Sequence, residues 1–558
     1  MTIDISEKMN ALALTLLAAV PVILWYFYTR VKYARFEQLA HIPRPPTSLV
    51  WGHLKIIGEI INKEPLRHYD YAFYELLKRT PDNDGLIALD IRPIGVPTIV
   101  IQSHELAEQI SKATPLFKYS VPKSRTTDVM IPVVGKKSLT LLNDEPWKNI
   151  RKQFNAAFAP SNLATFLPQI IDKAKVFLDV LDGYARSGAE FGLGEPCTLL
   201  TFDVIGLAVL NIDFKSQKSS SEQHKVVRYF RDLLATVPPT FAGDTWARHP
   251  MKHYRRIGIT KGIETSLRSI VQDKFDKLQK GDGKTLDRSV LALGLKSVDA
   301  LTPDILQQNV DSIKTFLFAG HDTTSILLQW AFYELSRTPR ALAALRDELN
   351  DLLGPDADPT ATANALLEGG DKLKLQYTSA VIKETLRLHP PAGTARMVPP
   401  GTDFRLQTKH GQLCVDGLAL YVCHYALQRD PAVYGVTAEA WVPERWLGQA
   451  STSSEDYASP SMGHDYQHRI PVSAWRPFER GPRNCVGQEL ANLEARLILA
   501  MAARRYDFTK VGLGAPALKH GEPVQDQHGQ YEVTKPLFET FNMSSKPVDG
   551  MKMTVKFQ

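Results

Sequence analysis

Apolar residues follow the spacing of α-helices over most of this chain. The periodicity predicts helices at 145–158, 168–184, 199–210, 263–280, 302–337 and 377–388. Strand character is confined to 86–91 and 96–101, where β-branched residues alternate or cluster between Gly and Pro. No internal repeat or long linker precedes residue 440, and the Ser-rich stretch 449–468 is typical of a surface insertion. The pattern therefore predicts one large domain that is mainly α with small β-sheets, an α+β fold.

The N-terminal segment has a different pattern. Residues 11–28 form an uncharged run, close to the ~20 apolar residues that span a bilayer. Arg30, Lys32 and Arg35 follow it, which places the rest of the chain in the cytosol by the positive-inside tendency. A cleaved signal would have a shorter apolar run and a small-residue cleavage site after it. We expect a lumenal tail at 1–10, a transmembrane anchor at 11–29, a basic and Pro-rich hinge at 30–46, and the folded domain at 47–558.

Composition and charge narrow the function. A chain of 558 residues with 44% hydrophobic and 23% charged residues can bury a large core, which excludes disordered and fibrous proteins. The net charge of +6 is too dilute for a polyanion partner, so we expect no nucleic-acid binding. Four widely spaced cysteines without a CxxC pair exclude a disulfide framework and make a structural zinc site improbable.

The longest predicted helix carries the first candidate chemistry. Thr302 and Pro303 form a good helix start, and nothing interrupts the pattern before Pro339. In its middle, residues 319–325 (AGHDTTS) are poor helix formers, and we expect a local distortion that opens a groove. Small residues there would let a flat ligand approach, and a neighbouring acid and hydroxyl could relay protons; these residues are Ala319, Gly320, Asp322 and Thr323. A kinked core helix with outward polar residues would show the same pattern.

A second candidate is the pair Glu384 and Arg387, which are neighbours on one helical face. An exposed pair of this kind contributes only about 0.2–0.5 kcal/mol and is common. Arg445, in the downstream run PERW, offers a planar guanidinium that could complete a buried carboxylate cluster.

The third candidate is the run 478–487 (FERGPRNCVG), which leads into a helical pattern. Cys485 would stand at a helix start, where the helix dipole and unpaired N–H groups favour the thiolate that ligates metals. Gly481 permits a tight loop, Gly487 leaves space for a macrocycle, and Arg483 could reach an anionic group at its edge. A lone cysteine is usually an inert buried thiol, but the surrounding ten residues favour a metal ligand.

In this order and spacing, the three motifs resemble the cytochrome P450 family, the haem-thiolate monooxygenases, of the microsomal type. The loop matches the family pattern F-x-x-G-x-R-x-C-x-G at every specified position. The resemblance implies a P450 fold with haem b (iron protoporphyrin IX) between the long distal helix and the proximal helix after Cys485, the iron ligand. It assigns propionate contacts to Trp147, Arg151, Arg396 and Arg483, shielding of the sulfur to Phe478, the distal face to Ala319, Gly320, Asp322 and Thr323, and a buried cluster to Glu384, Arg387 and Arg445.

The resemblance also implies a reaction and partners. The enzyme would insert one atom of O2 into a lipophilic substrate by hydroxylation, epoxidation or desaturation. The amino-acid sequence of residues 377–396 resembles that of filamentous-fungal members of the family that oxidise secondary metabolites such as aromatic polyketides or terpenoids. Pocket walls are expected at 129–134, 316–318, 392–398 and 541–544. An O2-independent isomerase or dehydratase of the same fold, and a non-catalytic haem or electron-transfer protein, remain alternatives.

Electrons must come from outside, because the chain has no GxGxxG segment in a strand–helix context and no flavin motif. The resemblance implies NADPH as their source, through NADPH-cytochrome P450 reductase, with cytochrome b5 as a second donor. We expect a single-pass protein of the endoplasmic reticulum membrane with a cytosolic catalytic domain. Basic residues around Lys148, Arg480 and Arg483 would attract an acidic partner.

Overall fold

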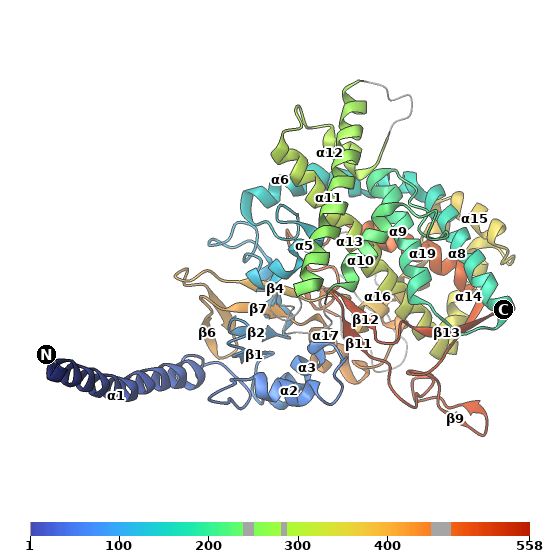
Figure 1. Ribbon diagram of the computed structural model, residues 1–558. Helices are drawn as coiled ribbons and strands as arrows, with labels where there is room; N and C mark the ends of the chain where they lie inside the picture. The colour runs from blue at the N-terminus through green and yellow to red at the C-terminus, as the bar shows by residue number, and fades with distance from the viewer. Residues whose placement is uncertain (1, 238–249, 281–286, 448–469) are drawn as a thin grey trace.

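The computed structural model describes residues 2–237, 250–280, 287–447 and 470–558, with side chains from Leu17 onwards. The predicted insertion at 449–468 lies outside the described residues. A single long helix, α13 (Pro303–Arg337), crosses the molecule (Figure 1), and Thr302 caps it by accepting a hydrogen bond from the Ile305 N–H. Most of its side chains from Asn309 to Leu335 are buried, so α13 is the core around which the other helices pack.

Helices that pack directly on α13 include α9 (Gly194–Leu210), α11 (Pro250–Gln279), α16 (Gln376–Leu388) and α19 (Gln488–Ala503). The predicted helices and strands are present, with ends shifted by a few residues. The remaining helices, in chain order, are α2 (Leu54–Ile61), α3 (Tyr69–Arg79), α4 (His104–Ser111), α5 (Ile131–Val134), α6 (Asp144–Asn155), α7 (Pro160–Leu163), α8 (Leu167–Ser187), α10 (Lys225–Ala235), α12 (Val290–Leu295), α14 (Pro339–Leu353), α15 (Pro359–Leu367), α17 (His424–Leu427) and α18 (Pro431–Tyr434).

The β-sheets are small and lie beside the helical core. The largest has the order β1 (Leu86–Leu89), β2 (Thr98–Ile101), β7 (Ala419–Val422) and β4 (Thr394–Met397), with β2 and β7 parallel. A second sheet joins β3 (Phe191–Gly192), β13 (Lys552–Phe557) and β8 (Tyr506–Lys510). Three further pairs are β5 (Arg405–Thr408) with β6 (Gly411–Cys414), β9 (Leu518–Lys519) with β10 (Glu522–Pro523), and β11 (Glu539–Phe541) with β12 (Ser545–Pro547). The content is mainly α with small sheets, as predicted.

The expected distortion at 319–325 is not found. The backbone of α13 is helical from Pro303 to Arg337 without interruption. The Thr323 hydroxyl donates to the Ala319 carbonyl at 2.8 Å, so the hydroxyl is accommodated within the regular helix. Packing of α13 against its neighbouring helices overrides the weak local propensity of these residues, although Ala319, Gly320 and Thr323 face the cavity.

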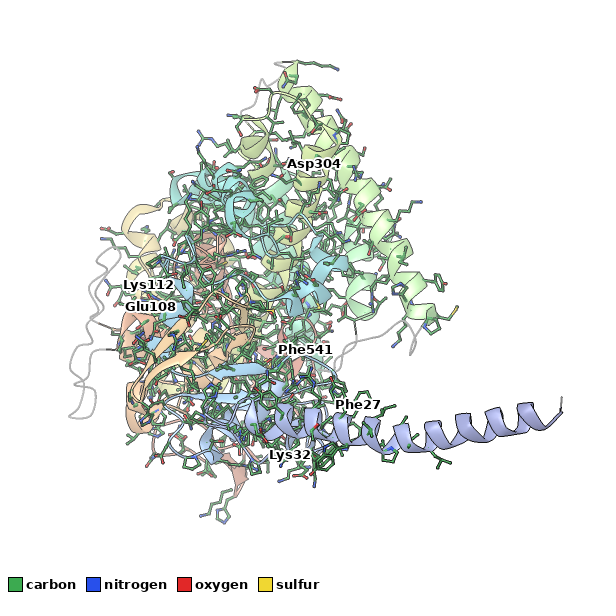
Figure 2. The ribbon with its side chains drawn as sticks, turned by 90° about the vertical axis from the view of Figure 1, so that its left-hand side faces the viewer. Phe27, Lys32, Glu108, Lys112, Asp304 and Phe541 are labelled. Atoms are coloured by element: carbon green, nitrogen blue, oxygen red, sulfur yellow. The ribbon has the colours of Figure 1, made fainter. Side chains whose placement is uncertain are left out.

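The N-terminal helix α1 (Thr2–Lys32) projects away from the body (Figures 1 and 2) and continues into a short π-helix, η1 (Tyr33–Glu37). Large apolar side chains between Leu17 and Tyr28 are exposed, Leu17 by 70% and Trp25 by 68%. Among the residues whose side chains are described, no helix has both the length and the apolarity to cross a membrane. The predicted anchor at 11–29, of which residues 11–16 fall outside that set, is therefore not confirmed.

Candidate active site

A cavity of about 300 Å³ lies between the middle of α13 and the loop that precedes α19. It brings residues from distant parts of the chain to one place. Its lining includes nine of the predicted cofactor and distal residues and one further threonine, Thr324. The nine are Cys485, Arg483, Gly487, Trp147, Arg151, Phe478, Ala319, Gly320 and Thr323. Cys485 and Thr323 therefore line the same enclosed space, as the motifs predict.

The loop before α19 presents the Cys485 side chain to this cavity. The Cys485 N–H donates to the Phe478 carbonyl at 2.8 Å, and the Asn484 N–H donates to the Gly481 carbonyl at 3.1 Å. Gly481 has φ +75°, and a Cβ there would lie 2.2 Å from the Ser111 carbonyl oxygen, so only glycine fits. A Cβ at Gly487 would stand 3.9 Å from the Cys485 sulfur, which shows how close this glycine lies to the thiol.

The helix start does not by itself make Cys485 a thiolate. Burial raises the pKa of the Cys485 thiol above its usual value, and the N–H groups of Gly487 and Gln488 and the charge of Arg151 oppose this only in part. That the helix dipole and the N–H groups hold Cys485 as a thiolate stays a prediction for the metal-bound form. A bound metal cation must displace the proton, because metal binding and thiol deprotonation are coupled.

Positive side chains lie at and behind the cavity wall: Lys123, Arg151 and Arg483 line the cavity, and Arg396, which does not, is the backbone partner of Lys123. Arg396 is fully buried and donates to the Ser120 hydroxyl at 3.1 Å, but its Nε and Nη2 atoms have no partner among the described residues. Lys123 donates to the Thr394 hydroxyl at 2.9 Å. Burial, with help from Arg396, lowers the pKa of Arg483 to about 9, and burial with Arg396 and Arg483 lowers the pKa of Lys123 well below its usual value. Such a cluster is costly unless an anion joins it.

Arg483 and Arg151 also organise the loop. Arg483 donates to the Leu142 carbonyl at 2.6 Å, and its guanidinium lies 4.8 Å from the centre of the Trp147 ring. Arg151 donates to both the carbonyl and the side-chain oxygen of Asn484, at 2.7 and 2.8 Å. These contacts connect α6 to the residue that precedes Cys485.

These features fit haem. The Cys485 thiol and the middle of α13 line the same cavity, and Gly487 leaves room beside the sulfur. Buried N–H groups of Arg396 that have no partner among the described residues could bind carboxylates such as the two haem propionates. Cys485 would hold the iron, and Arg396, Arg483 and Lys123 would hold the propionates. The fold and the site together place this protein in the class of haem-thiolate proteins.

The distal residues take different positions. Gly320 lines the cavity, but a Cβ on it would lie 2.5 Å from the Ile205 side chain, so it is also required for close packing of α9 on α13. Asp322 is buried and is not among the lining residues. Its carboxylate instead accepts from the Ser544 hydroxyl and pairs with the Lys546 ammonium at 2.6 Å.

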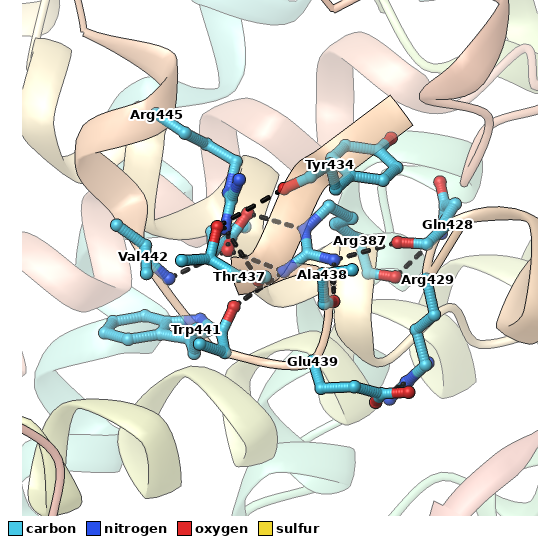
Figure 3. Close-up of polar contacts among 12 residues, drawn as sticks. Arg387, Gln428, Arg429, Tyr434, Thr437, Ala438, Glu439, Trp441, Val442 and Arg445 are labelled. Atoms are coloured by element: carbon cyan, nitrogen blue, oxygen red, sulfur yellow. Dashed lines mark hydrogen bonds and ion pairs between the residues drawn. The ribbon is translucent and has the colours of Figure 1, made fainter. Parts of the chain in front are cut away.

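Glu384, Arg387 and Arg445 form one fully buried cluster (Figure 3). Arg387 binds both oxygens of Glu384, at 2.8 and 2.9 Å, and Arg445 binds it at 2.9 Å. The Trp446 ring N–H and the Val442 backbone N–H complete the shell. Burial by itself would raise the pKa of Glu384, but the charges of Arg387 and Arg445 outweigh it and hold the pKa at about 2.

The cluster is connected to the cysteine loop through two residues that the motifs did not indicate. Arg387 donates to the Gln428 carbonyl at 2.8 Å, and the Gln428 side chain accepts from the Arg476 N–H at 2.9 Å. Arg476, two residues before Phe478, is fully buried and pairs with Glu108 at 2.7 Å. Lys123 was also missed. A short β-bridge between Lys123 and Arg396 brings it to the site, and no local sequence signal marks that contact.

The expected pocket walls are found in part. Phe316 and residues 392–394 line the cavity, whereas 129–134 and 541–544 are not among its lining residues. Its surface combines apolar side chains with the polar residues described above.

Comparisons with known proteins agree with this assignment. The cytochrome P450 family model matches residues 88–525, so the chain belongs to the cytochrome P450 family. It is 30% identical to cytochrome P450 monooxygenase acrF of Aspergillus aculeatus, over 88% of this chain and 98% of that protein. It is 29% identical to cytochrome P450 monooxygenase polC of Polytolypa hystricis, over 91% and 88%. The crystal structure of the cytochrome P450DA heme domain superposes with a TM-score of 0.66 at 18% identity, over 93% and 98% of the two chains. The chain is thus an oxidoreductase of the monooxygenase type.

Proposed function

We propose that this protein is a membrane-attached haem-thiolate monooxygenase that inserts one atom of O2 into a lipophilic substrate of fungal secondary metabolism, by hydroxylation, epoxidation or desaturation. The observation that carries the proposal is the position of Cys485 and Thr323 in one cavity whose lining also includes Lys123, Arg151 and Arg483. A ligand-binding or electron-transfer haem protein would not need a hydroxyl such as that of Thr323 on the wall that faces the cysteine loop.

When bound, haem supplies the activation of dioxygen, which a thiolate ligand favours by donating electron density. The chain supplies the rest. Phe478 lines the cavity beside Cys485, and the N–H groups of Gly487 and Gln488 bind the sulfur. Arg396 and Arg483 orient the cofactor, and α13 forms the wall where oxygen and substrate meet. The Thr323 hydroxyl can hold a proton-carrying water at the cavity, and Asp322, the preceding residue, can exchange protons with it.

The substrate class is supported by the resemblance of 377–396 to fungal enzymes of secondary metabolism, with an aromatic polyketide or a terpenoid as the leading candidates. Phe316, Phe158, Leu327 and Ile205 give the cavity an apolar wall on the α9 and α13 side. Members of the fold that rearrange or dehydrate substrates without O2 tend to lack the distal threonine, which is present here as Thr323.

Two measurements test the function. We expect the reduced protein to give the carbon monoxide difference band of a thiolate-ligated haem, and we expect oxidation to require O2, NADPH and a P450 reductase. Metabolite profiles of a deletion strain and its complemented control should then differ by the substrate and its oxygenated product. Turnover without O2 or NADPH would favour the isomerase or dehydratase, and a correct spectrum without any turnover would favour the non-catalytic protein.

We assign the electron supply to NADPH-cytochrome P450 reductase, with cytochrome b5 as a second donor. Arg480 and Lys148 contribute positive charge near the cysteine loop and α6, and each has a carboxylate nearby, Glu108 at 3.2 Å and Glu145 at 3.8 Å. An acidic partner would compete with those carboxylates for the same cations. Arg483 points into the cavity and is therefore assigned to the cofactor.

We also assign α1 to membrane attachment at the endoplasmic reticulum, with the catalytic domain in the cytosol. The support is the exposed apolar row between Leu17 and Tyr28 on a helix that projects from the body, followed by Arg30 and Lys32. Deleting residues 2–32 should move the protein from the membrane pellet to the supernatant while its carbon monoxide band is retained. Retention of the truncated protein in the pellet, with the full chain equally extractable by salt, would contradict this assignment.

A further inference from the structure

Glu479, which follows Phe478 in the cysteine loop, has a strained backbone. Its φ is +56°, in the left-handed region that glycine adopts freely and that other residues adopt at a cost. A glycine at this position would relieve that strain. A side chain that is kept in such a conformation points to a role for its own contacts.

The Glu479 carboxylate is held through one of its two oxygens. Oε1 accepts from the Ser111 hydroxyl at 3.1 Å, from the Arg480 backbone N–H at 3.0 Å and from the Arg476 guanidinium, whose Nε lies at 3.1 Å. Oε2 has no hydrogen-bond partner among the described residues, and the nearest ring nitrogen is Nε2 of His424 at 3.6 Å. The side chain is only 11% exposed, so its charge is fixed within the protein.

Two acids are among the lining residues of the cavity that contains Cys485, and they differ in charge. Burial raises the pKa of Glu494 well above its usual value, so this acid is neutral. Burial acts on Glu479 in the same direction, but the His424 ring and the charges of Arg476 and Arg396 outweigh it and hold the pKa well below its usual range. Glu479 therefore brings a negative charge to the wall of this cavity.

Arg476 fixes this charge from the side away from the cavity. Its side chain is fully buried, donates to the Ser111 hydroxyl at 2.7 Å and pairs with Glu108 at 2.7 Å as well as with Glu479. Glu108 is not among the lining residues of the cavity. Arg476 thus has two carboxylate partners, of which Glu479 alone belongs to the cavity wall.

We propose that Glu479 sets the reduction potential of the bound haem, because its fixed negative charge favours the ferric over the ferrous iron. This rests on the proposed monooxygenase function. One electron from the reductase converts ferric into ferrous iron, and this step makes or breaks no bond. Ferric iron carries one more positive charge than ferrous iron, so a carboxylate in the wall of the same cavity stabilises it. Glu479 therefore restrains electron uptake and limits the consumption of NADPH without substrate.

The test measures the midpoint potential of the iron in the full-length haem-loaded protein without substrate, by spectroelectrochemical titration. Glu479→Gln keeps the shape of the side chain and removes its charge. At the wild-type midpoint, the ferrous-to-ferric ratio should rise roughly tenfold, a positive shift of about 59 mV for one electron. Since a buried charge is screened little by salt, the shift should persist in about 1 M salt. With reductase and O2, this variant should also oxidise NADPH faster than the wild type.

Three further variants separate the charge from general damage to the loop. Glu479→Asp keeps the charge and tolerates the left-handed backbone, so its potential should stay close to that of the wild type. Glu108→Gln is the matched control, because it removes a carboxylate from the same arginine outside the cavity lining; its potential should also stay close to the wild-type value. If Glu479→Gln does not hold haem or loses the carbon monoxide band, Glu479→Gly, which relieves the strained backbone, carries the same titration.

An unchanged or more negative potential in the uncharged variant would overturn the inference. An equal shift in Glu108→Gln would also overturn it, since the effect would then come from a loosened Arg476 and not from the charge in the cavity wall. These outcomes are distinct from failure of the proposed function, which would show as a wild-type protein without the carbon monoxide band or without NADPH-dependent O2 reduction.

Discussion

Cys485→Ser should abolish the carbon monoxide band of the thiolate-ligated haem and reduce oxidation of any substrate to background. A serine hydroxyl cannot replace the sulfur, because its proton is held far more tightly and the soft thiolate donor is lost. The loss should exceed the ~10–100-fold that removal of an outer-shell partner of a metal ligand typically costs. Absorption spectra of the purified variant, with haem content measured in parallel, check this.

Cys414→Ser is the matched control for Cys485→Ser. Cys414 lies in β6 of a small peripheral sheet and is not among the lining residues of the cavity. Its replacement should leave the spectrum and the turnover unchanged. A Cys485→Ser protein with wild-type absorption and turnover would show that residue 485 is not the ligand, and the haem-thiolate assignment would fail.

Glu384→Gln should destabilise the fold by about 3–5 kcal/mol, the usual cost of removing one partner of a buried ion pair. The amide keeps the shape but removes the charge, so Arg387 and Arg445 remain buried without their counter-ion. The loss is a large part of the ~5–15 kcal/mol total stability of a typical domain. Urea unfolding followed by circular dichroism, and the yield of soluble haem-loaded protein, measure the effect.

The control for this variant is Glu368→Gln. Glu368 pairs with Lys372 on the surface, and its side chain is 65% exposed, so the change should cost at most about 0.5 kcal/mol. Comparable unfolding midpoints for Glu384→Gln and Glu368→Gln would contradict the role of the buried cluster.

The same cluster predicts a pH dependence of unfolding. The pKa of Glu384 is about 2 in the folded protein against 4.5 for the free group, because Arg387 and Arg445 outweigh the effect of burial. An acid whose pKa is lower in the folded than in the unfolded protein adds to the free energy of unfolding. This contribution is complete when the pH is above the pKa of the unfolded state, and it is lost as the pH falls to the pKa of the folded state. The contribution of Glu384 should therefore disappear between pH 4.5 and about 2, and Glu384→Gln should lack this component.

Much of the site could be predicted because its candidate residues lie close together in the sequence, in short contiguous segments. Phe478, Gly481, Arg483, Cys485 and Gly487 share one ten-residue loop, whose glycine and cysteine positions have local physical reasons. The long helix was also predictable, since apolar periodicity and the Thr302 cap are local signals.

Other predictions needed correction because packing and burial act between distant segments. The poor helix formers at 319–325 remain helical because most of α13 is buried against neighbouring helices. Gly320 is required by Ile205 of α9 as well as by the cavity.

The sequence alone determined the class of this protein, the long central helix and the carboxylate–arginine pair, and it predicted Cys485 as the iron ligand, since each depends on residues within a few positions of one another. Only the tertiary structure decided the partners of the buried charges: Lys123 beside Arg396, Gln428 between Arg387 and Arg476, and Lys546 on Asp322. A buried charge needs a partner of opposite charge or a hydrogen-bonding group, and that partner can come from any segment that the fold brings close. That meeting point depends on how sheets pair and helices cross, which no local pattern of residues specifies.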